Sequence, residues 1–119
     1  MSSNPLVSVI IPVHNGEKYL KEAIDSCLSQ DYSPMEIIVV DDKSEDRTLE
    51  ILNEYQKNNS ILKVIPSEKQ NGLGNVINIG IRNSTGKYIA RMDADDIMCP
   101  GRIKKQVEYM EKNPNCVAV

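Results

Sequence analysis

The stretch MEIIVVDD, residues 35–42, decides the fold class. Its run of β-branched aliphatic residues is typical of a strand, and two aspartates stand at its end. Similar runs occur elsewhere in the chain: LVSVIIPV at 6–13, ILKVIP at 61–66 and KYIARMD at 87–93. We therefore expect four strands, packed mainly by Val, Ile and Leu because the chain has no Trp and no Phe.

Amphipathic segments follow these strands. Apolar residues recur in them at the spacing of one buried helical stripe. The stripes are Tyr19, Leu20, Ala23, Ile24, Cys27 and Leu28; Leu49, Leu52 and Tyr55; Leu73, Val76, Ile77, Gly80 and Ile81; and Ile103, Val107 and Met110. Alternating strands and helices indicate a parallel sheet, because parallel neighbours need a crossover connection. We expect one doubly wound α/β domain over residues 1–119, with a mainly parallel sheet and helices on both faces.

Composition excludes several classes of protein. The net charge of −3, without a run of basic residues, argues against a nucleic-acid partner. The apolar stretches are too short to span a membrane and the first residues lack the pattern of a signal peptide, so we expect a cytoplasmic protein without a transmembrane segment. Cys27, Cys99 and Cys116 are odd in number and lack CxxC spacing, which predicts free thiols.

Ligands of doubly wound sheets bind in the loops at the carboxyl ends of the strands. The loop after the first strand, PVHNGEKYL, contains Pro12, which cannot donate to a strand ladder and is expected to end the strand. Asn15 and Gly16 suit a turn that starts the following helix. Taken alone, this loop fits turn chemistry as well as ligand binding.

The loop after the second strand, VVDDKSEDRT, holds more polar residues than a helix start needs. Asp42, Ser44 and Asp46 are each plausible N-caps, and one cap is enough. The excess, with Asp41 and Asp42 still attached to the strand end, indicates hydrogen bonding to a ligand. A solvated turn explains it equally well.

The third loop, PSEKQNGLGNVI, places two glycines before a helix. Glycine permits a ligand to approach the backbone closely. The loop is neither the strand-coupled GxGxxG of dinucleotide folds nor a P-loop, because the GKS/T sequence is absent. By itself it is a weak signal.

The fourth loop, RMDADDIMCP at 91–100, crowds Asp93, Asp95 and Asp96 into four positions. Such carboxylates repel one another, and a bound cation is the simplest relief. If Asp93 and Asp95 continue the extended chain, their side chains lie about 6 to 7 Å apart, at a rise of roughly 3.3 Å per residue. That spacing favours divided roles, with one carboxylate on a divalent cation that holds a diphosphate and the other on a hydroxyl or water. The alternative is an acidic N-capping loop before PGRIKKQVEYM.

The order of these motifs carries a family resemblance. From Leu6 onward, VSVIIPVHNGEKYL, EIIVVDDKSEDRT, NGLGNVINIGI, STGKYIARMDADD and PGRIKKQVEYMEKNP together resemble the family 2 glycosyltransferases. The resemblance implies the GT-A fold of the nucleotide-diphospho-sugar transferases. It also implies transfer of a sugar from a nucleotide-sugar donor, most often UDP-linked, to an acceptor hydroxyl with inversion, assisted by Mg²⁺ or Mn²⁺.

The resemblance also assigns residues to the donor site. Pro12, Val13, His14 and Glu17 would line the base and ribose pocket, Asp42 would accept from the base, Gly72 and Ala94 would contact the donor, Asp93 would contact the ribose, and Asp95 would hold the metal against the diphosphate. The family commonly has Tyr at the position of His14, Asn at that of Gln70, and Arg or Leu at that of Ile77. These differences affect the expected details of base and diphosphate contact.

In the family, the catalytic base comes from a later motif, which we expect beyond Val119. The chain then corresponds to the nucleotide-sugar-binding half of the catalytic domain, without the acceptor half, and should turn over little by itself. We expect an exposed strand edge beside the fourth strand, which favours self-association. The alternatives are a non-catalytic nucleotide-sugar-binding module and, more remotely, a receiver-like signalling domain, which would need an acidic pair where the first strand ends in PVHN.

Overall fold

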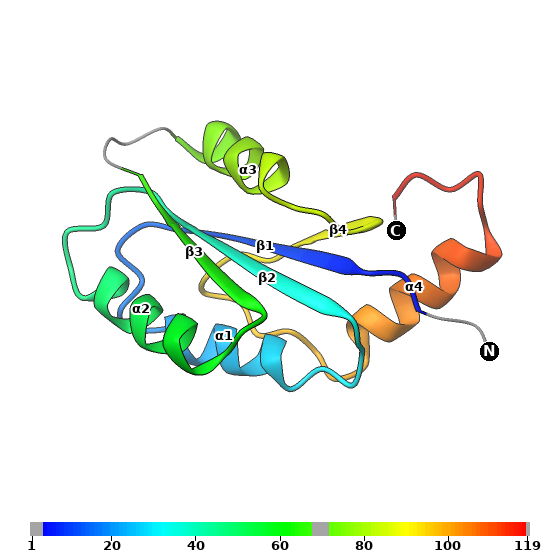
Figure 1. Ribbon diagram of the computed structural model, residues 1–119, viewed down its shortest axis with the longest axis horizontal. Coiled ribbons are helices and arrows are strands. Elements are labelled where there is room, and N and C mark those ends of the chain that lie inside the picture. The colour runs from blue at the N-terminus through cyan, green and yellow to red at the C-terminus, as the bar shows by residue number, and fades with distance from the viewer. Residues whose placement is uncertain (1–3, 68–71, 119) are drawn as a thin grey trace.

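A computed structural model describes residues 4–67 and 72–118. Within these residues strands and helices alternate along the chain (Figure 1): β1 Val7–Val13, α1 Leu20–Leu28, β2 Met35–Asp41, α2 Thr48–Asn58, β3 Leu62–Pro66, α3 Leu73–Arg82, β4 Tyr88–Arg91 and α4 Arg102–Lys112. The expected α/β alternation is confirmed. A search of the described helices found none with the length and apolar character needed to cross a membrane.

The four described strands form one parallel sheet in the order β3-β2-β1-β4. β1 pairs with β2 along its whole length, from Val7 opposite Met35 to Val13 opposite Asp41. On its other side β1 pairs with the four residues of β4. The order of strands therefore reverses between β1 and β4. Ligands of open α/β sheets bind beside the carboxyl ends of the strands at such a reversal.

Helices cover both faces of the sheet, as the sequence predicts. Figure 1 shows α1, α2 and α4 on one side and α3 on the other. Val9 and Ile11 of β1 pack with α1, α2 and α4, whereas Ile10 packs with α3. Every residue of β1 and β2 is buried. A strand covered on both faces needs apolar residues at successive positions, which explains the continuous run in each of these two strands.

The single described helix on the second face lies unusually close to the sheet. A Cβ added at Gly80 of α3 would stand 2.5 Å from Cγ2 of Ile10. Glycine permits this contact and brings Val76 onto the sheet. Three members of the predicted helical stripes are exposed: Tyr19 by 39%, Leu73 by 54% and Ile81 by 40%. For Leu73 and Ile81 the prediction is wrong because no other described helix packs beside α3, so only the central line of this helix is covered.

A buried carboxylate fixes the connection between α3 and β4. Glu36 accepts a hydrogen bond from Ser8 Oγ at 2.5 Å and from the backbone N–H of Thr85 at 2.7 Å. The hydroxyl of Ser8 accepts in turn from the N–H of Gly86 at 2.8 Å. Burial opposes the charge of Glu36, but the bonds from Ser8 and Thr85 outweigh it and hold the pKa of Glu36 below its usual value. The start of β4 is thereby held against β1 and β2.

The three cysteines are free thiols in the structure, as predicted. Cys27 is buried in the core of the α1 face, and burial raises the pKa of this thiol to about 12. Cys99 is exposed and Cys116 is half-buried. A thiol with a raised pKa is protonated at neutral pH and unreactive, so Cys27 acts as a core residue.

Candidate functional site

The loops after β1 and β2 leave the sheet through matching turns. Asn15 has a φ of 52° and Lys43 a φ of 53°. Each residue stands two positions beyond the end of its strand, and the strand ends Val13 and Asp41 are paired. Left-handed backbone is uncommon for residues that carry a side chain and recurs at functional sites. The two loops therefore run side by side at the carboxyl end of the sheet.

Hydrogen bonds join these two loops. In each bond a backbone N–H of one loop donates to a side chain of the other. The pairs are Asn15 to Ser44 Oγ at 2.8 Å, Glu45 to Asn15 Oδ1 at 2.7 Å, Gly16 to Thr48 Oγ1 at 2.8 Å and Glu17 to Asp46 Oδ2 at 3.2 Å. The polar excess that was interpreted as an indication of a ligand is partly explained by these contacts, which occupy Ser44 and Asp46.

Asp46 caps the start of α2. Arg47, directly before the helix, makes no side-chain cap, whereas Asp46 Oδ1 accepts from the N–H of Thr48 at 2.9 Å. Burial opposes the charge of Asp46, yet the hydrogen bonds from Thr48 and Glu17 hold its pKa below the usual value. Of the predicted caps Asp42, Ser44 and Asp46, Asp46 has this role.

His14 and Asp42 lie together at the mouth of β1 and β2. The ring nitrogen Nδ1 of His14 lies 2.7 Å from the backbone carbonyl oxygen of Asp42, and since a carbonyl only accepts, Nδ1 carries the proton. Nδ2 of Asn15 is 3.3 Å from Nε2 of His14, and Oδ1 of Asn15 accepts from Glu45, which assigns Nδ2 as the donor. These two contacts orient the imidazole of His14. His14 is exposed, whereas Asp42 is buried.

Three other predicted donor residues lie in or next to β1. Pro12 does not end the strand, which continues through Val13. Pro12 pairs with Val40 of β2 and stands beyond the last pair between β1 and β4, Ile10 with Arg91, so its missing N–H removes no bond of that ladder. The side chain of Val13 is buried in the core, and Glu17 is exposed in the loop.

Gly72 stands at the first position before α3. Its φ of 79° is left-handed, and nothing lies within 4 Å of the position that a Cβ would take. The positive φ therefore favours glycine at this position, although there is room for a side chain. The predictions about Gln70 and the rest of residues 68–71 lie outside the described residues.

The acidic loop, residues 92–101, connects β4 to α4 and turns at once. β4 ends at Arg91, and the N–H of Asp96 donates to the carbonyl of Asp93 at 3.0 Å. The expectation that Asp93 and Asp95 continue an extended strand is wrong. One oxygen from each of Asp93, Asp95 and Asp96 lies within 4.8 Å of the others, because the turn folds the chain back. The separation that favoured divided roles is absent, and the cluster is compact enough for one cation.

The acidic loop buries some of its side chains in the core and exposes the others. Met92, Ala94 and Met98 are buried, with exposed fractions of 3%, 7% and 3%. All three carboxylates are exposed. Ala94 thus anchors the loop, and its aspartates stand on the solvent side.

The charge of the acidic loop is only partly balanced by a neighbouring cation. The guanidinium of Arg91 lies 3.2 Å from Oδ1 of Asp93, and both side chains are about half exposed. Ion pairs this exposed contribute little to stability. Among the described residues, the one ion pair of this loop sets a single guanidinium beside three carboxylates, which leaves an excess of negative charge. Carboxylate oxygens are the ligands that Mg²⁺ and Mn²⁺ prefer. The loop therefore suits a divalent cation.

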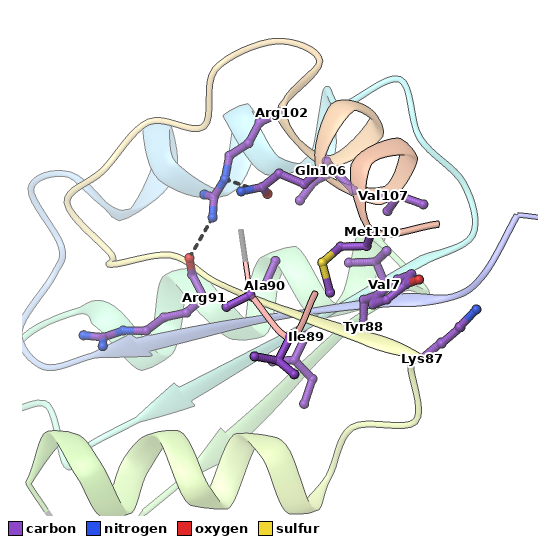
Figure 2. A pocket seen from close by; sticks show the side chains of 13 residues that line it. Val7, Lys87, Tyr88, Ile89, Ala90, Arg91, Arg102, Gln106, Val107 and Met110 are labelled. Atoms are coloured by element: carbon purple, nitrogen blue, oxygen red, sulfur yellow. Dashed lines mark hydrogen bonds between the residues drawn. The ribbon is translucent and has the colours of Figure 1, made fainter. Parts of the chain in front are cut away.

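A groove of about 480 Å³ lies between β4 and α4 (Figure 2). At one end of it Arg102 donates to the carbonyl of Arg91 and to Gln106, both at 3.2 Å. None of the predicted donor residues lines this groove. β4 is the edge strand of the described sheet and its Ile89 is 47% exposed.

Two side chains of the α1 segment that sequence reasoning missed hold the acidic loop. Gln30 donates to the carbonyl of Cys99 at 2.9 Å, and Ser26 Oγ accepts from the N–H of Met98 at 2.8 Å. These residues are about 70 positions apart in the sequence, and a polar residue near a helix end has no periodic signal. Only the packing of α1 against this loop reveals the contacts.

Comparisons with known proteins agree on one family. The family model described as glycosyl transferase family 2 matches residues 8–119. An uncharacterized glycosyltransferase of Haemophilus influenzae is 45% identical over 119 residues, which is 100% of this chain and 37% of the relative. The putative glycosyltransferase EpsE of Bacillus subtilis is 42% identical and shares 95% of this chain and 41% of its own length. The chain therefore spans well under half the length of these relatives.

Solved structures share the fold. S. aureus TarS 1-349 in complex with UDP-GlcNAc superposes with a TM-score of 0.84 at 32% identity, over 91% of this chain and 32% of that one. The mannosyltransferase PcManGT from Pyrobaculum calidifontis, in complex with GDP-Man and Mn²⁺, gives a TM-score of 0.85 at 24% identity, over 92% of this chain and 33% of that one. The second likeness is one of fold alone.

Proposed function

We propose that this chain, which belongs to glycosyl transferase family 2 and has the GT-A fold, is the donor-binding part of a glycosyltransferase. The observation that carries the proposal is the compact acidic cluster beside the point where strand order reverses. Asp93, Asp95 and Asp96 follow β4, next to the loop after β1. The complex of TarS with UDP-GlcNAc, at 32% identity, supports a nucleotide-sugar donor.

We assign the nucleoside to the paired loops after β1 and β2. Pro12, Val13, His14 and Glu17 line its pocket, and Asp42 accepts from the base. The oriented imidazole of His14, held by the carbonyl of Asp42, supports this assignment because a fixed ring loses little freedom when a base packs on it. Gly72 and Ala94 offer backbone to the donor.

The diphosphate belongs at the acidic loop. Asp95 would hold Mg²⁺ or Mn²⁺, and Asp93 would contact the ribose. The donor set fits such an ion, since three exposed carboxylates stand within 4.8 Å of one another and hard divalent cations take oxygen ligands. When bound, the ion stabilises the negative charge that grows on the departing nucleoside diphosphate. UDP-sugars are the donor class that the family resemblance favours.

The reaction is an inverting displacement in this proposal. The acceptor hydroxyl oxygen bonds to the anomeric carbon, the bond from that carbon to the diphosphate breaks, and the hydroxyl proton passes to a general base on the opposite side of the sugar. We place this base outside the 119 residues, in the remaining length of the longer relatives. By itself the chain then acts as a nucleotide-sugar-binding module with little turnover. Family membership leaves no support for the receiver-like alternative.

Calorimetric titration tests the donor site. UDP, GDP and their sugars are titrated with and without Mn²⁺. Asp95→Ala should remove the metal-dependent part of binding, whereas Asp42→Ala should weaken binding with and without metal because its partner is the base. No binding at millimolar ligand, or a metal-dependent signal that survives Asp95→Ala, would refute the donor site.

A further inference from the structure

Gln30 follows Ser29, the C-cap of α1, and its side chain bonds to residues on both sides of the end of the acidic loop. It is 8% exposed, and no oxygen of the three carboxylates is among its hydrogen-bond partners. We propose that Gln30 is a positioning residue, which holds the acidic loop in the shape that a divalent cation requires. The inference rests on the proposed function, because it concerns the same cation site.

The side-chain amide of Gln30 joins two points of the segment that follows the carboxylates. Nε2 donates to the carbonyl of Cys99 at 2.9 Å, and Oε1 accepts from the N–H of Ile103 at 3.2 Å. Ile103 is the second residue of α4, so its N–H has no partner within the helix. Gly101, directly before α4, has no side chain to cap it. Gln30 therefore supplies, from another element, the cap that the local sequence lacks.

Ser26 of α1 adds a second anchor to the same segment. Its Oγ accepts from the N–H of Met98 at 2.8 Å and donates to the carbonyl of Ala23 at 2.7 Å. Met98 is thereby tied to α1 and Cys99 to the residue that follows its C-cap. The buried side chains of Met92 and Met98 hold the loop on its core side.

These anchors matter because the three carboxylates repel one another and so oppose the closed shape of the acidic loop. Three exposed negative groups within 4.8 Å of one another favour a wider loop whenever no cation is bound. A loop that is already closed loses less conformational freedom on binding, and the cation binds more tightly. Without the bonds of Gln30, this segment is still held by the Ser26 anchor, by the bond from the N–H of Arg102 to the carbonyl of Cys99 and by its apolar side chains.

The test compares two glutamines with the same kind of bond. Gln30→Met removes the amide and keeps a chain of similar length. Gln56→Met is the matched control, because Gln56 Oε1 accepts from the N–H of Val64 at 2.7 Å and ties α2 to β3, away from the acidic loop. For each full-length variant, the affinity for Mn²⁺ alone is measured by calorimetry. Amide hydrogen exchange of residues 96–103 is measured without metal.

Gln30→Met should weaken Mn²⁺ binding about tenfold, as loss of groups that orient metal ligands does, and should speed exchange at residues 96–103. Gln56→Met should lower thermal stability while leaving Mn²⁺ affinity and exchange of the acidic loop unchanged. Ser26→Ala removes a single anchor, at Met98, and should shift both measurements in the same direction as Gln30→Met by a smaller factor.

Unchanged Mn²⁺ affinity and unchanged loop exchange in Gln30→Met would overturn the positioning role. The Mn²⁺ affinity of the wild-type chain tests the proposed function separately from this inference. If the wild-type chain binds no Mn²⁺, the proposed cation site fails. Faster loop exchange in Gln30→Met, beside unchanged exchange in Gln56→Met, then still shows that Gln30 holds the acidic loop, and equal exchange in the two variants overturns even that.

Discussion

Replacing Asp95 by Asn should stabilise the protein without metal and abolish its stabilisation by Mn²⁺. One carboxylate oxygen from each of Asp93, Asp95 and Asp96 lies within 4.8 Å of the other two. Two unit charges at 4.8 Å repel by about 0.9 kcal/mol in water. Salt at 0.15 M, with a Debye length of about 8 Å, reduces this to roughly 0.5 kcal/mol. Asp95 takes part in two such pairs, so its neutralisation should raise the free energy of unfolding by about 1 kcal/mol.

The assay is thermal unfolding followed by circular dichroism, first in EDTA and then with Mn²⁺. A gain of about 1 kcal/mol should raise the Tm of a chain of this length by roughly 4 °C. Mn²⁺ at ten times its Kd should stabilise the wild-type chain by about 1.4 kcal/mol. Asp31→Asn is the control, because Asp31 is an exposed aspartate outside the cluster. It should leave both measurements unchanged.

Two results would refute the reasoning. If Asp95→Asn is no more stable than the wild type in EDTA, the three carboxylates do not stand as close as the turn at Asp93 and Asp96 places them. If Mn²⁺ raises the Tm of Asp95→Asn as much as that of the wild type, Asp95 is not a metal ligand. Asp95→Asn should have a higher Tm than the wild type in EDTA and a smaller gain in Tm on addition of Mn²⁺. This combination distinguishes a metal-binding residue from one that stabilises the fold.

Three further predictions concern the sheet. Gly80→Ala should lower the free energy of unfolding by about 1 kcal/mol, because overpacking against Ile10 costs about 1–3 kcal/mol and the higher helix propensity of alanine offsets about 1 kcal/mol of that cost. An increase in the urea midpoint would contradict this prediction. Stability from Glu36 should be present above its unfolded pKa of 4.5 and disappear as pH falls through the lower folded pKa, and Glu36→Gln should flatten that part of the pH profile of urea midpoints. The chain should self-associate through β4, and Ile89→Lys should shift light scattering toward monomer; a wild type that stays monomeric at high concentration would count against the exposed edge as an association site.

Sequence reasoning located the strands closely because their signal is local. The run at 35–42 predicts β2 to within one residue of its observed end at Asp41. The largest error concerns the fourth strand, which was extended through Asp93 and ends at Arg91. Periodicity describes the direction of side chains while a strand continues and contains no information on where the chain turns. The turn that ends β4 changed the expected spacing of the carboxylates.

The burial of the predicted helical stripes was confirmed in α1 and was partly wrong in α3. Leu20 and Ile24 of α1 are buried as expected, because α2 and α4 lie on the same face as α1. Leu73 and Ile81 of α3 have the same kind of periodicity and are exposed. An apolar stripe predicts which side of a helix can be buried. The number of neighbouring elements decides how much of that side is covered.

Local sequence is enough to specify the type of each element, the parallel α/β class and the chemical identity of the candidate ligands. These properties depend on residues that are neighbours along the chain, whose preferences act before the chain is compact. Tertiary structure alone decided that Asp93, Asp95 and Asp96 share one small volume and that Ser44 and Asp46 bind the neighbouring loop. It also decided that Gln30 reaches Ile103, 73 positions away. Such contacts depend on how helices pack on one face of the sheet, which local periodicity does not specify.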